Sequence, residues 1–535
     1  MSKYSKIIVV LLISTIAGGL SPDPISILYS MIEITAVWIF SASLYKKNRV
    51  IGYLVNSVLL FVIMMQQAVL YFSGEYVTTI MLMNIESFKA LGAKLPIYLF
   101  AVFVVIVISL LPMKFSQLPS ILSKKISVAL SVIYFIVAVT LSFTVYSLTS
   151  SFSPIGSFAG TIESIIIEKY NTNLYSRLEN TKARKAFKRD FIADGVTRPE
   201  ELPEQPNVIV IFTEGLSKEL IDTDKVENLM PNLAALEQES LSFENYFNHT
   251  AATYRGLRGQ LYSSYQHPDG VGNTITAEKG GIISIVDVLK AQGYYSEFIN
   301  SEPTNKDFTK YLNSLKYNKV VSKKVDRNVT DKEMFKLLEK KAETIEQPFF
   351  LSMYNIGTHH GFESPDVKYG DGKSDVLNKF HNYDAQFGKF FEEFKKSDLA
   401  KNTILILTAD HATFPSPEFK QAISSDQTDF IAPIPLMIYY DGVVPQKIDA
   451  QSRNSLDLTP TILDLLDVQQ VNNYFLGNSL FQNEEVDAFE RVSAIGDNFY
   501  STAPNRSTLI NPDDENFKGT IASIKDYYSF AMHSN

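Results

Sequence analysis

The chain has 535 residues, of which 46% are hydrophobic and 20% are charged, and its formal net charge is −9. It contains no cysteine, which excludes disulfides, thiolate zinc sites and cysteine nucleophiles. The 36 Phe and 28 Tyr exclude disorder as the main state. Residues 1–150 carry ten Lys or Arg and four Asp or Glu, whereas the rest of the chain is acidic. An acidic soluble part is not expected to bind nucleic acid.

Five apolar stretches in the first part of the chain are long enough, or nearly so, to cross a bilayer. They are residues 7–20, 25–45, 50–72, 95–113 and 126–148. The first is not expected to be a cleaved signal peptide, because the sequence SPDP follows it without a small-x-small cleavage site. Since Lys and Arg precede the first stretch and join the second to the third and the fourth to the fifth, we expect these segments to face the cytoplasm. Five spans then predict a multi-pass protein of a bacterial inner membrane, with its soluble part on the periplasmic or extracellular side.

Glu33 lies inside the second stretch, where a charge is costly and marks a functional candidate. The alternative is a protonated or helix-paired structural side chain. Residues 151–206 are predicted to connect the membrane part to a domain at 207–535. In this connector, four Ile between 162 and 167 suit a helix on the membrane surface. A basic run at 182–189 is consistent either with binding to anionic lipid headgroups or with a solvated helix face. The three prolines that follow indicate a linker.

The soluble part alternates the patterns of strands and helices. Apolar runs predict strands at residues 207–212, 294–299, 349–354, 403–407 and 436–440, and helices are predicted at 231–236, 282–290 and 458–466. This alternation predicts an α/β domain with a mainly parallel central sheet.

Polar side chains follow three of these predicted strands. Glu214 comes after the first, Asp410 and His411 come after the run at 403–407, and His359 and His360 come after the run at 349–354. In such sheets, ligands collect at the carboxyl ends of the strands. Carboxylates with an imidazole suit Zn²⁺ or Mn²⁺, with Mg²⁺ also possible. A single strand-end acid is more often a helix cap, but the combination in one domain favours a site for one divalent ion.

A hydroxyl-rich segment, HTAATYRGLRG at residues 249–259, contains a candidate nucleophile. A threonine hydroxyl such as that of Thr253 reacts near neutral pH only when a base or metal lowers its pKa. Arg255 and Arg258 are of the residue type that binds phosphoryl groups. Catalysis at this segment and a merely structural segment both remain open at this point.

Five motifs in this order resemble those of a known family. They are NVIVIFTEGLS from residue 207, Thr-x-Arg-Gly at 253–256, THHGF at 358–362, TADH at 408–411 and LDLTPTILDLL at 456–466. Together they resemble the sulfatase-like branch of the alkaline phosphatase superfamily. The membrane part makes the chain similar to the branch's membrane members: lipoteichoic acid synthases, phosphoglycerol transferases and phosphoethanolamine transferases.

The resemblance implies roles for individual residues. Glu214, Asp410 and His411 match metal ligands, and Thr253 matches both nucleophile and metal ligand. His359 matches the histidine that contacts the substrate phosphate or the leaving group, while His360 is left without a role. Arg255 and Arg258 would bind the phosphoryl group. Asp457 would head a structural helix.

The chain departs from these relatives in visible places. Lipoteichoic acid synthases have a Trp and an Arg after a mid-domain strand, where this chain reads NSEPTN at 300–305, and its one Trp is Trp38 in the second apolar stretch. The headgroup pocket is therefore expected to be built differently. Phosphoethanolamine transferases tend to be rich in disulfides, which this chain lacks. No C/S-x-P-x-R motif surrounds Thr253, which disfavours sulfatase chemistry.

The resemblance implies transfer of a phosphoglycerol or phosphoethanolamine group from a membrane phospholipid to an extracytoplasmic glycan or lipid, through a phosphothreonine at Thr253. One alternative is a metal-dependent hydrolase that passes the same intermediate to water. The other is a non-catalytic scaffold of the envelope. The scaffold should have lost a metal ligand or the nucleophile, and neither is lost here.

Overall fold

The computed structural model describes residues 5–19, 25–73, 76–78, 81–82, 95–112, 129, 132–133, 136, 153–175, 185–194, 198–222, 226–267, 282–482 and 488–532. The chain forms two compact units, Met1–Ile167 and Glu168–Asn535. Helix α7 (Pro154–Tyr175) runs across the boundary between these units.

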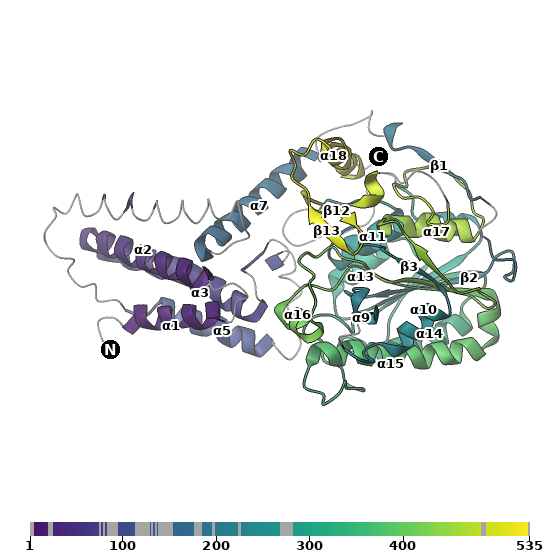
Figure 1. Ribbon diagram of the computed structural model, residues 1–535, viewed down its shortest axis with the longest axis horizontal. Helices are drawn as coiled ribbons and strands as arrows, with labels where there is room; N and C mark the ends of the chain where they lie inside the picture. Colours follow the sequence, from purple (N-terminus) through teal and green to yellow (C-terminus); the bar gives the residue numbers. More distant parts are fainter. Residues whose placement is uncertain are drawn as a thin grey trace. The chain divides into compact units, whose positions relative to one another are not determined.

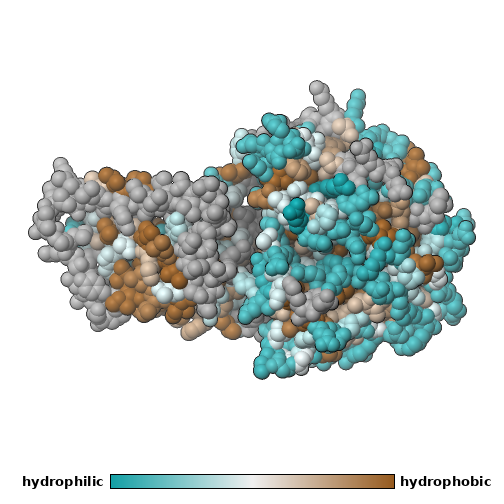
Figure 2. Space-filling model, in the orientation of Figure 1, coloured by the Kyte–Doolittle hydropathy of each residue, from teal (hydrophilic) through white to brown (hydrophobic). Residues whose placement is uncertain are grey.

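The first unit is helical. Its described helices are α1 (Ser5–Gly19), α2 (Ile25–Lys47), α3 (Arg49–Ser73), α5 (Leu95–Ser109) and the first part of α7. Among the described residues, two helices are long and apolar enough to cross a membrane, at Ser26–Lys47 and Arg49–Ser73. Hydrophobic side chains are exposed on this unit (Figure 2), among them Leu12, Leu28, Leu54 and Val58. The predicted fifth span lies almost wholly outside the described residues, so the five-span topology stays a prediction.

Glu33 is buried in the first unit, where it binds the start of α7. The Ser153 hydroxyl donates to Glu33 Oε1, and the Ile155 N–H donates to Oε2 at 3.0 Å. The first N–H groups of a helix have no partner within the helix, and the positive end of its dipole favours an anion. The carboxylate therefore caps α7, which supports the helix-paired structural interpretation of Glu33.

The second unit is built on an eight-stranded sheet, in the order β5-β4-β6-β2-β7-β8-β3-β9. The bounds are β2 (Asn207–Thr213), β3 (Leu241–Glu244), β4 (Tyr295–Asn300), β5 (Lys319–Val321), β6 (Phe349–Asn355), β7 (Thr403–Ala409), β8 (Leu436–Tyr439) and β9 (Gln446–Asp449). From β5 to β7 all neighbours are parallel, and β8 is antiparallel to both of its neighbours. The central strands β6, β2 and β7 are completely buried, as their continuous apolar runs require. The predicted mainly parallel sheet is confirmed.

Helices cover both faces of this sheet (Figure 1). On one face lie α10 (Pro231–Gln238), α14 (Asp331–Thr344) and α15 (Asp375–Lys396), and on the other lie α11 (Thr253–Tyr262) and α17 (Leu458–Leu465). Helix α12 (Ile285–Ala291) packs against α11. Further helices are α9 (Glu219–Asp222), α13 (Lys306–Ser314), α16 (Pro417–Ile423) and α18 (Lys518–Met532). The helices predicted at 231–236, 282–290 and 458–466 are all present, with ends shifted by one to three residues.

Two small sheets accompany the large one. Strands β11 (Val492–Ile495), β12 (Asn498–Ala503) and β13 (Arg506–Leu509) form an antiparallel meander. Strand β1 (Arg189–Phe191) pairs with β10 (Gln470–Asn473). Part of the predicted connector therefore belongs to the second unit, because β1 is bonded into it.

Candidate metal and catalytic site

Three candidate metal ligands come together at the carboxyl end of the central sheet. Glu214 follows β2, while Asp410 and His411 follow the neighbouring parallel strand β7. One ligand atom of each lies within 4.8 Å of the others, and all three residues are buried. His411 Nε2 lies 3.5 Å from Glu214 Oε1 and 3.4 Å from Asp410 Oδ2. The sequence prediction that these residues meet is thus matched by their geometry.

The hydrogen bonds around this cluster leave its ligand atoms facing inward. His411 Nδ1 is 2.8 Å from the Ala412 carbonyl oxygen and donates to it, so Nε2 is the ring nitrogen that faces the two carboxylates. Asp410 Oδ1 accepts from the N–H groups of Gly215, at 2.9 Å, and His411, at 2.8 Å. Asp410 Oδ2 is buried and has no hydrogen-bond partner among the described residues. A buried carboxylate oxygen without a partner is costly, and two carboxylates with an imidazole fit a divalent cation.

The two carboxylates have pKa values shifted in opposite directions. Burial, together with the neighbouring Glu214, raises the pKa of Asp410 well above its usual range. Burial acts to raise the pKa of Glu214 as well, but His411, His359 and two hydrogen bonds hold it below its usual value.

Thr253 places its hydroxyl at this cluster. It is the first residue of α11, and its Oγ1 donates a hydrogen bond to Glu214 Oε2 at 3.0 Å. The residue is partly exposed, whereas the three ligands are buried. Ala252, just before it, has φ 73°, a left-handed conformation that is strained for alanine. The hydroxyl is thus held against a metal ligand while it remains open to a substrate.

Helix α11 packs closely against the backbone at the end of β7. A Cβ on Gly256 would lie 2.2 Å from the Asp410 carbonyl oxygen, so only glycine allows this approach. Gln260, one turn further on, donates to the Ala409 carbonyl at 2.9 Å. These contacts explain the Thr-x-Arg-Gly motif: the glycine lets the helix dock where Thr253 reaches Glu214.

His359 lies in the turn that follows β6. It is partly exposed, and its Nδ1 bonds the His360 carbonyl at 2.7 Å. The Thr358 hydroxyl donates to the Glu214 carbonyl oxygen, which ties this turn to the metal cluster. His359 also lies near enough to Glu214 to lower its pKa. The structure thus places the His359 turn beside the site, and the role of His359 in catalysis stays a prediction.

The two predicted phosphate-binding arginines are both buried. Arg258 is 1% exposed, donates to the Tyr265 carbonyl at 3.3 Å and lies over the Tyr262 ring. This placement suits a structural role and does not favour substrate binding. Arg255 is 7% exposed, and its backbone, not its guanidinium, hydrogen-bonds the buried His249, whose pKa burial lowers to about 3. Substrate binding by either arginine stays a prediction.

Sequence reasoning did not identify Tyr354 as part of the site. This residue is the next to last of the buried strand β6, and its hydroxyl donates to Glu214 Oε2. The register explains the contact, because Tyr354 pairs with Phe212 two positions before Glu214. The only signal in the sequence is a hydroxyl at the end of an otherwise apolar run.

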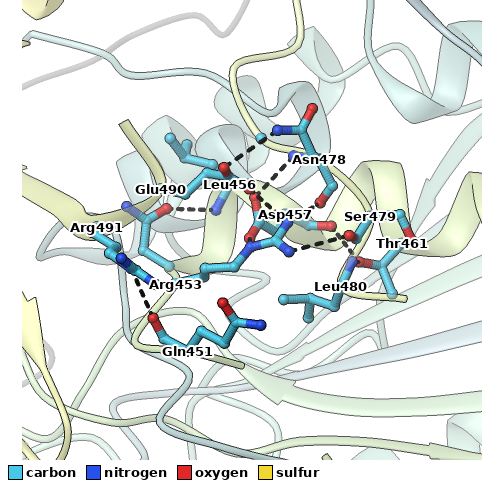
Figure 3. Close-up of polar contacts among 12 residues, drawn as sticks. Gln451, Arg453, Leu456, Asp457, Thr461, Asn478, Ser479, Leu480, Glu490 and Arg491 are labelled. Carbon is cyan, nitrogen blue, oxygen red and sulfur yellow. Dashed lines mark hydrogen bonds and ion pairs between the residues drawn. The ribbon is translucent and has the colours of Figure 1, made fainter. Parts of the chain in front are cut away.

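Asp457 lies in a separate buried cluster of charges (Figure 3). Arg453 Nε is 2.6 Å from Asp457 Oδ2, and Arg453 NH2 is 2.5 Å from Glu490 Oε1. The Asn478 N–H donates to Asp457 Oδ1 at 3.1 Å. Asp457 comes just before α17, and its contacts join distant loops, which agrees with the structural role implied by the resemblance.

The model of one known family, Sulfatase, matches residues 206–468. The chain is 24% identical over 362 residues to lipoteichoic acid synthase 2 of Bacillus subtilis, covering 59% of this chain and 55% of the relative. It is 22% identical over 302 residues to phosphoglycerol transferase I of Xanthomonas axonopodis pv. citri, covering 50% of this chain and 42% of the relative. The chain thus spans about half the length of the curated relatives it matches.

Two solved structures share the fold. A protein in the alkaline phosphatase superfamily from Vibrio parahaemolyticus has a TM-score of 0.51 and 20% identity, over 68% of this chain and 94% of that one. The lipoteichoic acid synthase LtaP from Listeria monocytogenes also has a TM-score of 0.51, with 15% identity, over 65% of this chain and 97% of that one. At these identities the likeness shows the fold alone.

Proposed function

We propose that this chain, whose residues 206–468 form a domain of the sulfatase family, moves a phosphoglycerol or phosphoethanolamine group from a membrane phospholipid to an extracytoplasmic glycan or lipid. The observation that carries the proposal is the hydroxyl of Thr253, 3.0 Å from Glu214 Oε2 within a buried set of metal ligands. The names of the relatives, lipoteichoic acid synthase and phosphoglycerol transferase, support the transfer of a phosphoglycerol group.

Glu214, Asp410 and His411 would hold one divalent ion, with Thr253 as a further ligand. Their oxygen and nitrogen donors suit Mn²⁺ or Zn²⁺, and Mg²⁺ is also acceptable. Such an ion lowers the pKa of a neighbouring hydroxyl and stabilises charge on a transferring phosphoryl group.

In the first step, Thr253 Oγ forms a bond to the phosphorus of the lipid, and the phosphorus–oxygen bond to diacylglycerol breaks. The threonine proton leaves toward Glu214 Oε2, which already accepts its hydrogen bond. His359, beside the cluster, donates a proton to the leaving oxygen of diacylglycerol.

In the second step, a hydroxyl of the acceptor attacks the phosphothreonine. His359 now takes the proton of that hydroxyl, the Oγ–phosphorus bond breaks, and Thr253 regains its proton. The reaction is thus two substitutions at phosphorus with a covalent intermediate between them.

The apolar helices of the first unit would keep the enzyme at the bilayer that contains the donor. Such anchoring raises the effective concentration of a lipid without a tight pocket. The five-span topology predicts that a reporter fused after Lys47 is cytoplasmic and one fused after Pro206 is external. An external signal at Lys47 would contradict the orientation.

Transfer and hydrolysis are separated by following the labelled headgroup phosphate of a phospholipid, with and without a candidate glycan. Label that moves onto the glycan supports the transferase, and label released only as free headgroup phosphate supports the hydrolase. Label that stays in the lipid with the wild-type chain, as with Thr253→Ala, would support a non-catalytic scaffold.

A further inference from the structure

Glu302 lies in the loop that follows β4, beside the metal cluster. Strand β4 pairs in parallel with β6, so this loop leaves the sheet at the same edge as Tyr354. The Ile356 N–H donates to Ser301 Oγ at 3.1 Å, which fixes the loop against the end of β6. Glu302 is partly exposed, so a ligand in the site can reach it.

The same loop is connected to the nucleophile's neighbour. Helix α13 begins right after the loop, and its Phe308 ring packs against Tyr254, with centroids 5.3 Å apart. The hydroxyl of Tyr311, also in α13, donates to the Tyr254 carbonyl. Since Tyr254 follows Thr253 directly, the loop with Glu302 and the helix with Thr253 form adjoining walls of one site.

The carboxylate of Glu302 is held rigidly. Its own N–H donates to Asn300 Oδ1 at 2.8 Å. Asn305 Nδ2 donates to Glu302 Oε2 at 3.1 Å, and Asn305 also caps α13 by accepting from the Phe308 N–H. Within the described part of the chain, no Lys, Arg or His pairs with Glu302, and its Oε1 has no hydrogen-bond partner.

The surroundings of Glu302 are acidic. Its carboxyl lies near Glu214, and the Tyr354 phenol, bonded to Glu214, lies near both carboxylates. No Lys, Arg or His among the described residues offsets the carboxylate of Glu302, so a cationic part of a ligand would be favoured beside it.

The charge of the donor's headgroup decides which phospholipid fits beside Glu302. The two acidic metal ligands balance one divalent ion, so Glu302 adds an unbalanced negative charge where an anionic phosphodiester must bind. A glycerol headgroup brings no compensating charge. An ethanolamine headgroup brings an ammonium, and ammonium–carboxylate hydrogen bonds are among the strong ones in proteins.

On the basis of the proposed function, we propose that Glu302 binds the ammonium of the headgroup and makes an ethanolamine phospholipid the preferred donor. The ammonium donates to the free Oε1 of Glu302, and the phosphorus lies at Thr253. In this role Glu302 determines specificity, and it takes no part in the two substitutions at phosphorus.

The test compares phosphatidylethanolamine and phosphatidylglycerol as donors for the full chain in mixed micelles. The intact mass identifies the group on Thr253, and initial rates give kcat/KM for each donor. The wild type should prefer phosphatidylethanolamine. Glu302→Gln keeps the shape and removes the charge, so the preference should fall by about tenfold or more. Asp307→Asn removes an exposed carboxylate of the same segment and should leave the preference unchanged.

Metal content, measured on the same samples, separates this role from metal binding. Glu302→Gln should keep the full metal content of the wild type, and loss of the ion would overturn the proposal. An adduct only from phosphatidylglycerol, or an equal loss for both donors in Glu302→Gln, would overturn it while leaving the proposed transfer intact. No adduct from either donor would instead overturn the proposed function, and this inference with it.

Discussion

Two buried clusters of acidic side chains lie in the second unit, and they differ in where their positive charge comes from. In one, the guanidinium of Arg453 pairs with both acids (Figure 3). Its Nε lies 2.6 Å from Asp457 Oδ2, and its NH2 lies 2.5 Å from Glu490 Oε1. In the other, Glu214 and Asp410 lie on either side of the imidazole of His411. Among the described residues, no Lys or Arg pairs with these two carboxylates.

The difference shows which cluster stabilises the fold and which binds a ligand. A buried carboxylate is tolerated when a paired cation and hydrogen bonds compensate its lost hydration. Arg453 provides this compensation within the chain, so the Asp457 cluster is complete without a ligand. The Glu214 cluster has no such partner among the described residues, as expected of side chains that would hold a cation. Its unpaired acids, next to the hydroxyl of the partly exposed Thr253, are the reason for proposing it as the reactive site.

Thr253→Ala should give the largest effect, because it removes the atom that forms the covalent intermediate. Turnover is expected to fall by on the order of 10⁴-fold or more, while the free energy of unfolding changes by about 1–2 kcal/mol. Thr253→Ser should retain part of the activity. The measurements are initial rates with labelled phospholipid and denaturant unfolding.

Thr250→Ala is the matched control. The Thr250 hydroxyl donates to the Ala494 carbonyl at 2.7 Å, away from the metal ligands. Its loss should reduce stability by about 1 kcal/mol and leave the chemistry in place. Loss of activity in Thr250→Ala but not in Thr253→Ala would show that the nucleophile is misassigned.

Arg453→Ala tests the other half of the comparison. Removing this cation leaves Asp457 and Glu490 buried and unpaired, which should cost about 3–5 kcal/mol in the free energy of unfolding. Arg491→Ala is the control, because Arg491 is exposed and its Nε donates to the Gln451 carbonyl oxygen at 3.0 Å. Its effect should stay within about 0.5 kcal/mol. Equal losses in the two variants would contradict the structural role of the Arg453 cluster.

Gly256→Ala should reduce activity without removing a reactive group. The new Cβ would meet the Asp410 carbonyl oxygen at 2.2 Å, so α11 must move and carry Thr253 away from Glu214. A shift of about 1 Å at a reacting group costs about 10²-fold in rate. Gly519→Ala in α18 meets no atom within 4 Å and should keep full activity. Unchanged rates in Gly256→Ala would argue against the close docking of α11.

Among these variants, Asp410→Asn should change the free energy of unfolding least, and its effect should be specific to metal binding. Metal affinity should fall at least about tenfold. The metal-free variant should be as stable as the metal-free wild type or more so, since Asp410 Oδ2 is buried and has no hydrogen-bond partner among the described residues. Asp457→Asn should lower stability by about 1–3 kcal/mol, because Arg453 loses a partner. Calorimetry with and without a chelator measures the stability of both variants. Equal destabilisation of metal-free Asp410→Asn and Asp457→Asn would contradict the difference between the two acidic clusters.

The strand ends were the part of the site that the sequence predicted well. Glu214, Asp410 and His411 follow apolar runs, and parallel strands must bring such positions to one edge. Tyr354 was not predicted, because its contact with Glu214 depends on the register between β2 and β6. Glu302 lies in the stretch 300–305, where a differently built headgroup pocket was expected, but the sequence did not single it out, since only the folded loop shows that it approaches Glu214.

Residue type alone was a weaker guide. Arg258 was predicted to bind phosphate from its chemistry, but the fold buries it under Tyr262 and bonds it to the Tyr265 carbonyl. The site stands at the first turn of α11, and Arg258 lies more than one turn further along the helix. Which face of α11 meets the sheet depends on Gly256 and Gln260, whose packing role the sequence does not reveal.

The most direct test of the account is the intact mass of the full chain after incubation with phospholipid and a divalent metal. The account predicts one added headgroup phosphate, located at Thr253 by peptide mapping, absent in Thr253→Ala and discharged when an acceptor is added. An unmodified chain that nevertheless turns over the lipid, or an adduct on another residue, would contradict the proposed covalent mechanism.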